Sequence, residues 1–522
     1  MAKTVNLDAM IPRADFREAQ ESPSQAEQIQ TLNLSQLSPD SFLVPSLRKP
    51  DFQRETTQWT PAQVLVFLKS FLDNELVPSV ILWRSPEKLF VIDGAHRVSA
   101  LLAWINDDYG DGINSRKFFE DKITDEQKKI ADTLRKKIQN EIGSFATIKD
   151  AMYDTSTIHD DILKARASNA RTRALSLQWV EGDAAKAETS FFKINKQGTP
   201  LDKTEERLLR ERAKPIAIAA RSIMRAGTGH KYWSNFEPEI VSRIEELSSE
   251  LNGYLFSPEI KYPVKTLNLP HGGRSSPISA YNLLMDLIAY IVVGTTAVDD
   301  KIYIYQVDKD GTNTIRTLEA CIKTMKRITG NEMASLGLHP AVYFYNSNGR
   351  HMDAIFLGMT KVVANAVRNN DSIFFKKFTK RRKIIEKIFL ENKPLLNQAN
   401  SAIYSARRVD KWADFIEKTT DEEQFGGEFT QEDILEALDL KGKVIAADVE
   451  EIGANFSDST KSAIFLLETI RAAQKCPLCG GYIQMEKSAS YDHIEAKHHG
   501  GNGAVSNIQI THPYCNSIKG SD

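Results

Sequence analysis

The sequence predicts a multidomain α+β protein with an α/β front domain, a largely helical middle and a small metal-pinned tail. The chain has 522 residues, a length typical of about three domains. Short apolar runs alternate with helical patterns in the front part, whereas the helical period dominates from about residue 120 to about residue 420. The last forty-seven residues then hold three of the four cysteines and four of the ten histidines.

Composition narrows the class of protein. The 67 Lys and Arg residues nearly balance the 69 Asp and Glu residues, so any DNA contact must be local rather than spread over a basic surface. The few, clustered cysteines favour a reduced compartment and a metal site over a disulfide scaffold. The first residues lack an apolar signal core. The longest apolar run, "ISAYNLLMDLIAYIVVG", carries Asn282 and Asp286. We therefore expect a buried helix there, no membrane contact and a cytoplasmic protein.

The front of the chain predicts a small α/β domain over residues 41–210. Residues 1–40 are polar and rich in Gln, Ser and Pro, which predicts a flexible arm. The β-rich runs "VPSVILW" and "KLFVID" are bounded by turn residues and predict strands. Between arm and strands, "TPAQVLVFLKSFLDN" predicts a helix with Thr60 as N-cap and Pro61 at its first position.

The stretch "FVIDGAHRVSALLAW" predicts a strand, a tight turn and a helix. Gly94 permits the turn, and the free N–H groups at a helix start attract phosphate. Arg97 offers a two-pronged fork to the same anion, and Asp93 is suited to hold a cation or polarise a water. Taken alone, an ordinary turn with a solvated arginine explains this pattern better.

Helical patterns then continue through a middle domain over residues 211–425. Both "LDKTEERLLRERAKPIAIAARSIM" and "FFKKFTKRRKIIEKIF" show apolar residues at helical spacing. Gly426 and Gly427 precede a capping box from Thr430 to Asp433, which predicts a boundary. We expect a helical connector over residues 426–474 and a separate tail domain over residues 475–522.

The tail contains two pairs of metal-ligand residues. Cys476 and Cys479 form a CxxC pair, and His512 and Cys515 form an HxxC pair. Two such pairs suit tetrahedral zinc, since each chelates from one side, and a Cys₃His set makes a closed, structural site. The alternative is two unrelated pairs of surface residues, which the Cys-poor remainder of the chain disfavours.

Five ordered elements of the tail, "CPLC", "DHI", "GGNG", "SNIQ" and "CNSIK", resemble the HNH nuclease family in its zinc-containing ββα-metal form. Many members have Cys at the position of His512, and histidine is an adequate zinc ligand. The resemblance implies a DNA-cleaving active site with a divalent cation, Mg²⁺ or Mn²⁺.

The resemblance also implies roles for individual residues of the tail. His493 is the expected general base, since imidazole titrates near neutral pH. Asp492 and Asn516 are the expected ligands of the catalytic cation. Asn507 is expected to orient the imidazole of His493 through a hydrogen bond, and Lys519 to contact a phosphate of the DNA.

A second resemblance covers about residues 40–210. "PDFQRETTQW", then "DGAHR", then "AETSFFKINKQGTPLDKTE" resemble, in this order, the ParB/sulfiredoxin-like domains of GmrSD-type restriction proteins. Ala95 and His96 stand where that pattern has two glutamines, and a related form with histidine occurs in DndB-like proteins. The resemblance implies a site for a nucleoside triphosphate formed by Arg54, Asp93, Gly94, His96, Arg97 and Asn195.

A basic cluster in the helical middle includes Lys380, Arg381 and Arg382. Such a cluster either follows the phosphate backbone of DNA or forms a solvated helix face, and the sequence alone weighs these about equally. Attachment to a nuclease-like tail favours DNA contact.

Together these patterns predict a metal-dependent DNA endonuclease or nickase, with structural Zn²⁺, a catalytic Mg²⁺ or Mn²⁺ and a regulatory nucleotide. Restriction-like defence against foreign or modified DNA is the expected role. Two alternatives stay open: a nucleotide-switched DNA-binding protein with a purely structural zinc tail, and an NTPase that depletes nucleotide. The sequence does not decide whether the chain forms a homo-oligomer.

Overall fold

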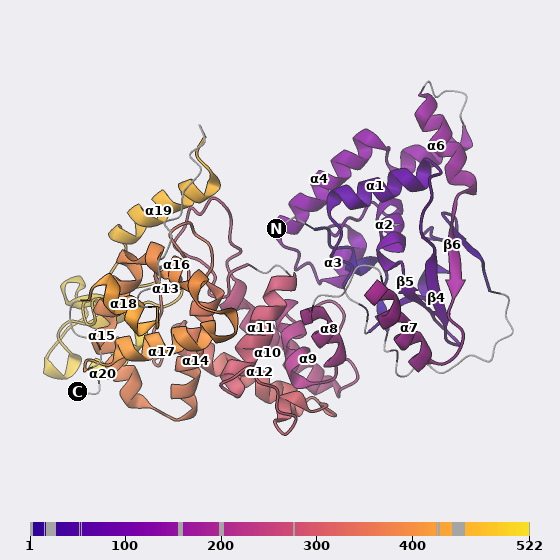
Figure 1. Ribbon diagram of the computed structural model, residues 1–522. Coiled ribbons are helices and arrows are strands. Elements are labelled where there is room, and N and C mark those ends of the chain that lie inside the picture. Colours follow the sequence, from indigo (N-terminus) through magenta and orange to yellow (C-terminus); the bar gives the residue numbers. More distant parts are fainter. Residues whose placement is uncertain are drawn as a thin grey trace. The chain divides into compact units, whose positions relative to one another are not determined.

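The structure is a computed structural model that describes residues 4–14, 16, 28–51, 53, 55–154, 160–197, 203–274, 277–423, 425, 429–440 and 455–520. The chain divides into two compact units (Figure 1). The first unit comprises residues 1–212 and 228–232, and the second comprises residues 213–227 and 233–522.

A six-stranded mixed sheet forms the centre of the first unit. The pairs β1–β3, β3–β5 and β4–β6 are parallel, whereas β4–β5 and β2–β6 are antiparallel. The two strands expected around "VPSVILW" and "KLFVID" are present as β4 and β5. In spatial order the strands are β1 (Arg13–Ala14), β3 (Leu47–Pro50), β5 (Leu89–Asp93), β4 (Val80–Arg84), β6 (Ala174–Trp179) and β2 (Thr31–Asn33).

Eight helices of the described chain accompany this sheet. Thr60 caps the first of them in a reciprocal capping box with Gln63, and Pro61 occupies its first turn, as predicted. The helices are α1 (Pro61–Leu72), α2 (Ala95–Ile105), α3 (Ile113–Phe118), α4 (Asp125–Glu141), α5 (Phe145–Tyr153), α6 (Asp161–Thr172), α7 (Ala184–Gln197) and α8 (Lys203–Arg210).

The two faces of the sheet are both covered, because successive side chains of a strand point to opposite faces. In β5, Leu89 and Val91 join a core with α1, α2 and α4. Phe90 and Ile92 join a second core with Phe191 of α7. Asp93 therefore ends a strand that is buried on both faces, next to the start of α2.

The expected flexible arm over residues 1–40 is wrong for the described part of that segment. Val5, Leu7 and Ile11 are each at most 1 % exposed and belong to the main core of the unit. Backbone N–H groups of Val5 and Leu7 donate to the carbonyls of Trp59 and Thr56. The physical reason is that β1 and β2 of this segment provide the two edges of the sheet.

The second unit is largely helical. Its apolar run forms the buried helix expected there, α11, and no helix in the described part of the chain is long and apolar enough to cross a membrane. The helices are α9 (Pro215–Met224), α10 (Pro238–Phe256), α11 (Pro277–Val292), α12 (Thr312–Ile328), α13 (Pro340–Tyr343), α14 (Asp353–Arg368), α15 (Ser372–Glu391), α16 (Lys393–Ala402), α17 (Arg408–Thr420), α18 (Gln431–Ala437), α19 (Asp458–Ala472) and α20 (Pro513–Lys519).

Local signals explain two of these helix starts. The pattern over residues 201–224 forms α8 and α9, and Pro215 begins the second helix because it lacks the N–H that a continued helix would need. Thr430 and Asp433 form the predicted capping box at the start of α18. Gly426 and Gly427 lie outside the described residues.

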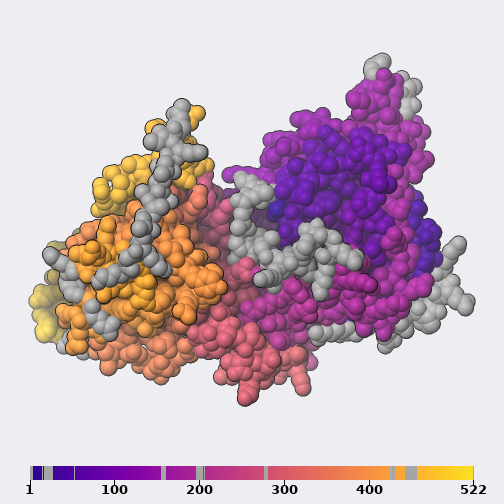
Figure 2. Space-filling view, viewed as in Figure 1, coloured from indigo at the N-terminus to yellow at the C-terminus, as the bar shows by residue number. Residues whose placement is uncertain are grey.

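The tail belongs to the same unit as the helical middle. Its hairpin of β7 (Ser490–His493) and β8 (Ile508–Thr511) is followed by α20. The Arg327 guanidinium carbon lies 3.6 Å from the ring centroid of Phe375 on α15 and 4.6 Å from that of Tyr514 on α20. The yellow surface of the tail adjoins the orange surface of the helices in Figure 2.

Candidate functional site

The four metal-ligand residues predicted in the tail come together. One donor atom from each of Cys476, Cys479, His512 and Cys515 lies within 4.8 Å of the others, and all but Cys479 are buried. A tight turn closes the first pair, because the N–H of Gly480 donates to the carbonyl of Cys476. The second pair lies at the start of α20, where His512 is the N-cap.

The histidine of this cluster has a defined orientation. His512 Nε2 lies 3.0 Å from the carbonyl of Tyr482, while Nδ1 lies 3.3 Å from Cys479 Sγ. A donor at Nε2 leaves Nδ1 as the ligand atom, which is how a second partner fixes the tautomer of a metal-binding histidine. Hydrogen bonds from the Cys479 and Cys515 thiols lower the pKa of Cys476. Three sulfurs and one imidazole in a closed cluster fit structural Zn²⁺.

Strand alternation places the next residues on two faces of the hairpin. Asp492 lies directly opposite Gln509, and His493 lies opposite Ile508. Asp492 is 8 % exposed and faces α20, whereas Tyr491 and His493 point to the other face. His493 is half-buried, and no described residue forms a hydrogen bond with its imidazole.

Asp492 is held by two donors on one oxygen. Its Oδ2 accepts hydrogen bonds from Gln509 Nε2 at 2.7 Å and from Lys519 Nζ at 2.9 Å. Lys519 also donates to the carbonyls of His493 and Ile494. The lysine expected at a DNA phosphate therefore bonds to the carboxylate and to the end of β7 in this structure.

Asn516 lies on α20 against the same strand. Its Nδ2 donates to Ser490 Oγ at 2.8 Å and to the carbonyl of Tyr491 at 3.1 Å. Because both amide protons are directed at β7, the carbonyl oxygen Oδ1 is the part of the side chain left to bind a cation. Asp492 and Asn516 thus share the seam between β7 and α20.

The hydrogen bond expected from Asn507 to His493 is absent from the described residues, so that expectation is corrected. Asn507 Oδ1 accepts from the N–H of Glu495 at 2.7 Å, and its Nδ2 donates to the carbonyls of Glu495 and Asn502. The side chain therefore closes the loop between the two strands. Asn507 therefore holds the backbone at Glu495, two residues after His493, and does not orient the imidazole of His493.

Gln509 is a site residue that the sequence analysis missed. It contacts Asp492 only because the hairpin register pairs these two positions. The signal in the sequence is weak, since the register follows from the length of the loop between the strands.

The structure contradicts DNA contact by Arg381 and Arg382, which are 4 % and 1 % exposed. Arg381 donates to the carbonyls of Thr419 and Phe425. Arg382 pairs with Glu386 at 2.7 Å and donates to two carbonyls at residues 336 and 337. Both lie on the face of α15 that packs into the unit. Lys380 remains exposed, 3.0 Å from Glu422.

The ion pair of Arg382 and Glu386 joins the tail to α15. Glu386 Oε2 accepts a 2.6 Å hydrogen bond from the N–H of Tyr482, and Oε1 accepts from Tyr343. A Cβ added to Gly481 would lie 2.6 Å from Arg382 Nε. Burial alone would lower the pKa of Arg382, but the charge of Glu386, its hydrogen bond to the guanidinium and the neighbouring Tyr343 and Cys479 together outweigh burial and raise the pKa.

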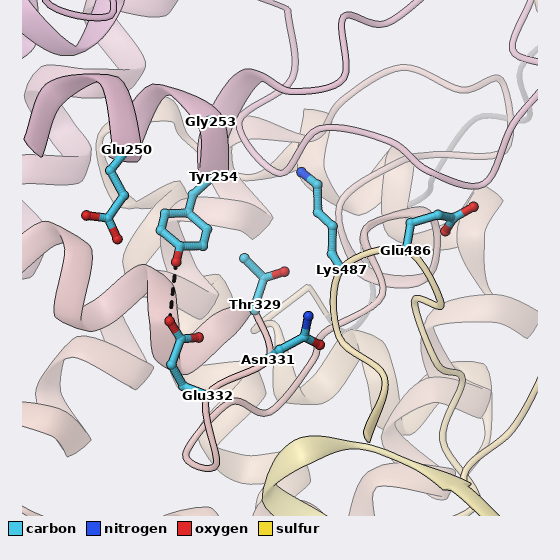
Figure 3. A pocket seen from close by; sticks show the side chains of 9 residues that line it. Glu250, Gly253, Tyr254, Thr329, Asn331, Glu332, Glu486 and Lys487 are labelled. Atoms are coloured by element: carbon cyan, nitrogen blue, oxygen red, sulfur yellow. Dashed lines mark hydrogen bonds between the residues drawn. The ribbon is translucent and has the colours of Figure 1, made fainter. Parts of the chain in front are cut away.

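A pocket of about 640 Å³ lies where the tail meets the helical body (Figure 3). Lys326 bridges Glu250 at 2.8 Å and Glu332 at 3.7 Å. Burial lowers the pKa of Lys487 to about 8, and its Nζ donates to the carbonyl of Ser257. The lining of the pocket thus carries charged groups of both signs. Its lining comprises Glu250, Gly253, Tyr254, Thr329, Gly330, Asn331, Glu332, Glu486 and Lys487.

In the first unit, the turn after β5 has the predicted form. Gly94 adopts φ +92° and precedes α2, and an added Cβ would lie 2.9 Å from Val80 Cγ2. Asp93 and Arg97 pair at 2.7 Å, and Arg97 also donates to the carbonyl of Ser79. The guanidinium is thus engaged within the protein, and its role as a phosphate fork stays a prediction.

Segments far apart in the sequence meet at this turn. The ring of His96 stacks on Trp59 with centroids 5.5 Å apart, and Gln53 Nε2 donates to the carbonyl of Ile92. Arg54 lies outside the described residues. Asn195 lies on α7, but its side chain is outside the described part of the structure.

Family models match two parts of the chain. Residues 476–522 match the family model of the HNH endonucleases, and residues 34–212 match the model of the GmrSD restriction endonuclease N-terminal domain. Searches of curated proteins and of solved structures give no match. The fold and the site therefore define a DNA-cleaving hydrolase. More particularly, the two matched parts are a GmrSD-type N-terminal domain and an HNH domain that carries the Cys₃His cluster, and this combination supports a restriction-like nuclease.

Proposed function

We propose that the chain is a metal-dependent DNA endonuclease or nickase in which His493 of the HNH domain is the general base. The first unit regulates DNA cleavage by binding a nucleotide. The observation that supports it best is that Asp492 and Asn516 lie together between β7 and α20, with the half-buried His493 as the next residue of β7. A purely structural zinc tail would need none of these three residues, which argues against the DNA-binding alternative.

In this mechanism His493 accepts a proton from the attacking water, because a neutral imidazole is a base near pH 7. Gln509 and Lys519 hold Asp492 by Oδ2, so that Oδ1 and the carbonyl oxygen of Asn516 form the cation-binding pair. A Mg²⁺ or Mn²⁺ ion, when bound, supplies positive charge for the charge that develops on the phosphate.

In the proposed function, the structural zinc site would hold α20, and with it Asn516, in position. His512 and Cys515 lie at the start of that helix, whereas Cys476 and Cys479 lie on a separate turn. Binding all four would fix α20 relative to that turn. Zinc therefore positions Asn516 without taking part in the chemistry.

The direct test is nicking of supercoiled plasmid by full-length protein with Mg²⁺. His493→Ala should lower cleavage by about 10²- to 10⁴-fold, the usual contribution of a general base. His498→Ala is the matched control, since His498 is an exposed histidine of the same domain on a short 3₁₀ helix, Lys497–His499, and should cut like wild type. Equal cleavage by His493→Ala and wild type would refute the assignment of the base.

The nucleotide site of the proposal consists of the start of α2 with Asp93, His96 and Arg97, beside Trp59. Arg97→Ala should weaken binding of nucleoside triphosphates in calorimetry, and Arg116→Ala, an exposed arginine of the same unit, should not. If wild type binds none of the common triphosphates, the regulatory part is wrong. Restriction-like defence against modified DNA would then need another sensor.

A further inference from the structure

Helix α15 has one buried face and one exposed face of opposite character. The buried face carries Arg381 and Arg382 among apolar side chains. Five lysines of α15 are exposed, and four of them, here called the lysine row, follow one another at intervals of four, three and four residues, which places them on one side of a helix. The row consists of Lys376, Lys380, Lys383 and Lys387.

The helix that carries the row lies along the nuclease domain. Near its start, Phe375 contacts Tyr514 of α20 with ring centroids 6.3 Å apart. Two turns later, the methylene groups of Lys383 lie over Gly480 in the zinc-binding turn, where an added Cβ would be 3.1 Å from Cδ. Helix α15 therefore lies beside both the helix that holds Asn516 and the turn that holds Cys476 and Cys479, and Lys383 of the row contacts that turn.

The charges of the row are mostly unneutralised. Lys380 lies 3.0 Å from Glu422, but their side chains are 75 % and 67 % exposed, and such pairs contribute little. No ion pair involves Lys376, Lys383 or Lys387 among the residues that the structure describes. In a chain whose formal net charge is −2, this is a local concentration of positive charge.

We propose that the lysine row binds the phosphate backbone of duplex DNA and aligns the duplex with the hairpin that carries His493. The proposal rests on the nuclease function proposed above. From Lys376 to Lys387 the helix rises about 16 Å at 1.5 Å per residue. That length spans about five phosphates of one strand at 3.4 Å each, so each of the four lysines can reach a phosphate of its own.

Salt dependence of binding tests this directly, because each phosphate contact contributes about −0.9 to the slope of log K against log salt. Binding of a 30-base-pair duplex would be measured with full-length His493→Ala protein and Mg²⁺, so that DNA is not consumed. Changing all four lysines of the row to Gln should flatten the slope by about 3 to 4. The same change at four other exposed lysines should not. That matched control uses Lys265, Lys301, Lys309 and Lys323 of the same unit.

The possible outcomes distinguish a failure of the lysine-row proposal from a failure of the proposed nuclease function. A flattened slope for the row variant alone supports the proposal, even if wild type proves unable to cut. Equal slopes for the row and control variants overturn it, even if wild type cuts normally. Absence of any DNA binding by the parent protein overturns it as well. In cleavage assays of the row variant we expect a raised KM with kcat at saturating DNA unchanged.

Discussion

Replacing Arg382 by Met should detach the zinc-binding turn from α15. The side chains of Arg382 and Glu386 are 1 % and 2 % exposed. The substitution leaves a buried carboxylate whose remaining donors, among the residues that the structure describes, are Tyr343 and the N–H of Tyr482. Removing one partner of a buried ion pair costs about 3–5 kcal/mol. By contrast Lys380→Met on the same helix breaks an exposed pair and should cost about 0–1 kcal/mol.

Hydrogen exchange measures the loss of stability peptide by peptide. It can therefore assign the loss to the region around Arg382, whereas global unfolding would mix the two units. Peptides covering α15 and residues 476–482 should exchange about 100- to 5,000-fold faster in Arg382→Met. Adding Glu386→Gln should restore part of the protection, because it removes the uncompensated charge. Exchange equal to wild type in Arg382→Met, or an equal effect of Lys380→Met, would refute the idea that this ion pair anchors the tail.

Three further predictions concern the second unit. Cys476→Ala should abolish zinc binding, seen by metal analysis, and make residues 476–520 sensitive to protease, since a small tail depends on its metal; a resistant tail would contradict this. Burial lowers the pKa of His271 to about 3. The unfolded chain therefore takes up a proton below pH 6.5 that the folded chain refuses, so stability should fall by up to about 1.4 kcal/mol per pH unit as pH decreases from 6.5 toward 3. The urea concentration at the unfolding midpoint should decrease less steeply with falling pH in His271→Leu than in wild type. An equally steep decrease in both proteins would contradict this role of His271. Gln509→Leu should raise the Mg²⁺ concentration for half-maximal cleavage by about 10- to 100-fold, because Asp492 loses a donor, and an unaltered Mg²⁺ titration would exclude that role.

Local patterns predicted the parts of the fold that depend on neighbouring residues. The N-cap at Thr60, the turn at Gly94 and the two ligand pairs of the zinc cluster all depend on residue types at short spacing. The residues that form the cores of the first unit could not be predicted from such local patterns. Val5 and Leu7 belong to a short, mostly polar segment, and only the pairing of β1 with β3 makes the neighbouring chain part of the sheet.

Helical periodicity alone predicts that Arg382 is buried. On α15, residues 378, 381, 382, 385 and 389 share one helix face, and three of them are Phe378, Ile385 and Phe389. Helical periodicity therefore already placed the arginine on the apolar side. What the sequence could not provide is the partner across that face, the N–H of Tyr482 on Glu386. Nothing in either segment alone signals that contact.

The contacts between the tail and the helical body also limit where recombination can exchange domains between such nucleases. A crossover just before Cys476 would transplant Tyr514 without the Arg327 and Phe375 that enclose it. It would also separate Tyr482 from Glu386. A foreign body would have to supply a matching carboxylate and ring at the same positions. Viable chimeras should therefore inherit the whole second unit, so that the cutting domain passes between proteins as a cassette that begins near residue 213.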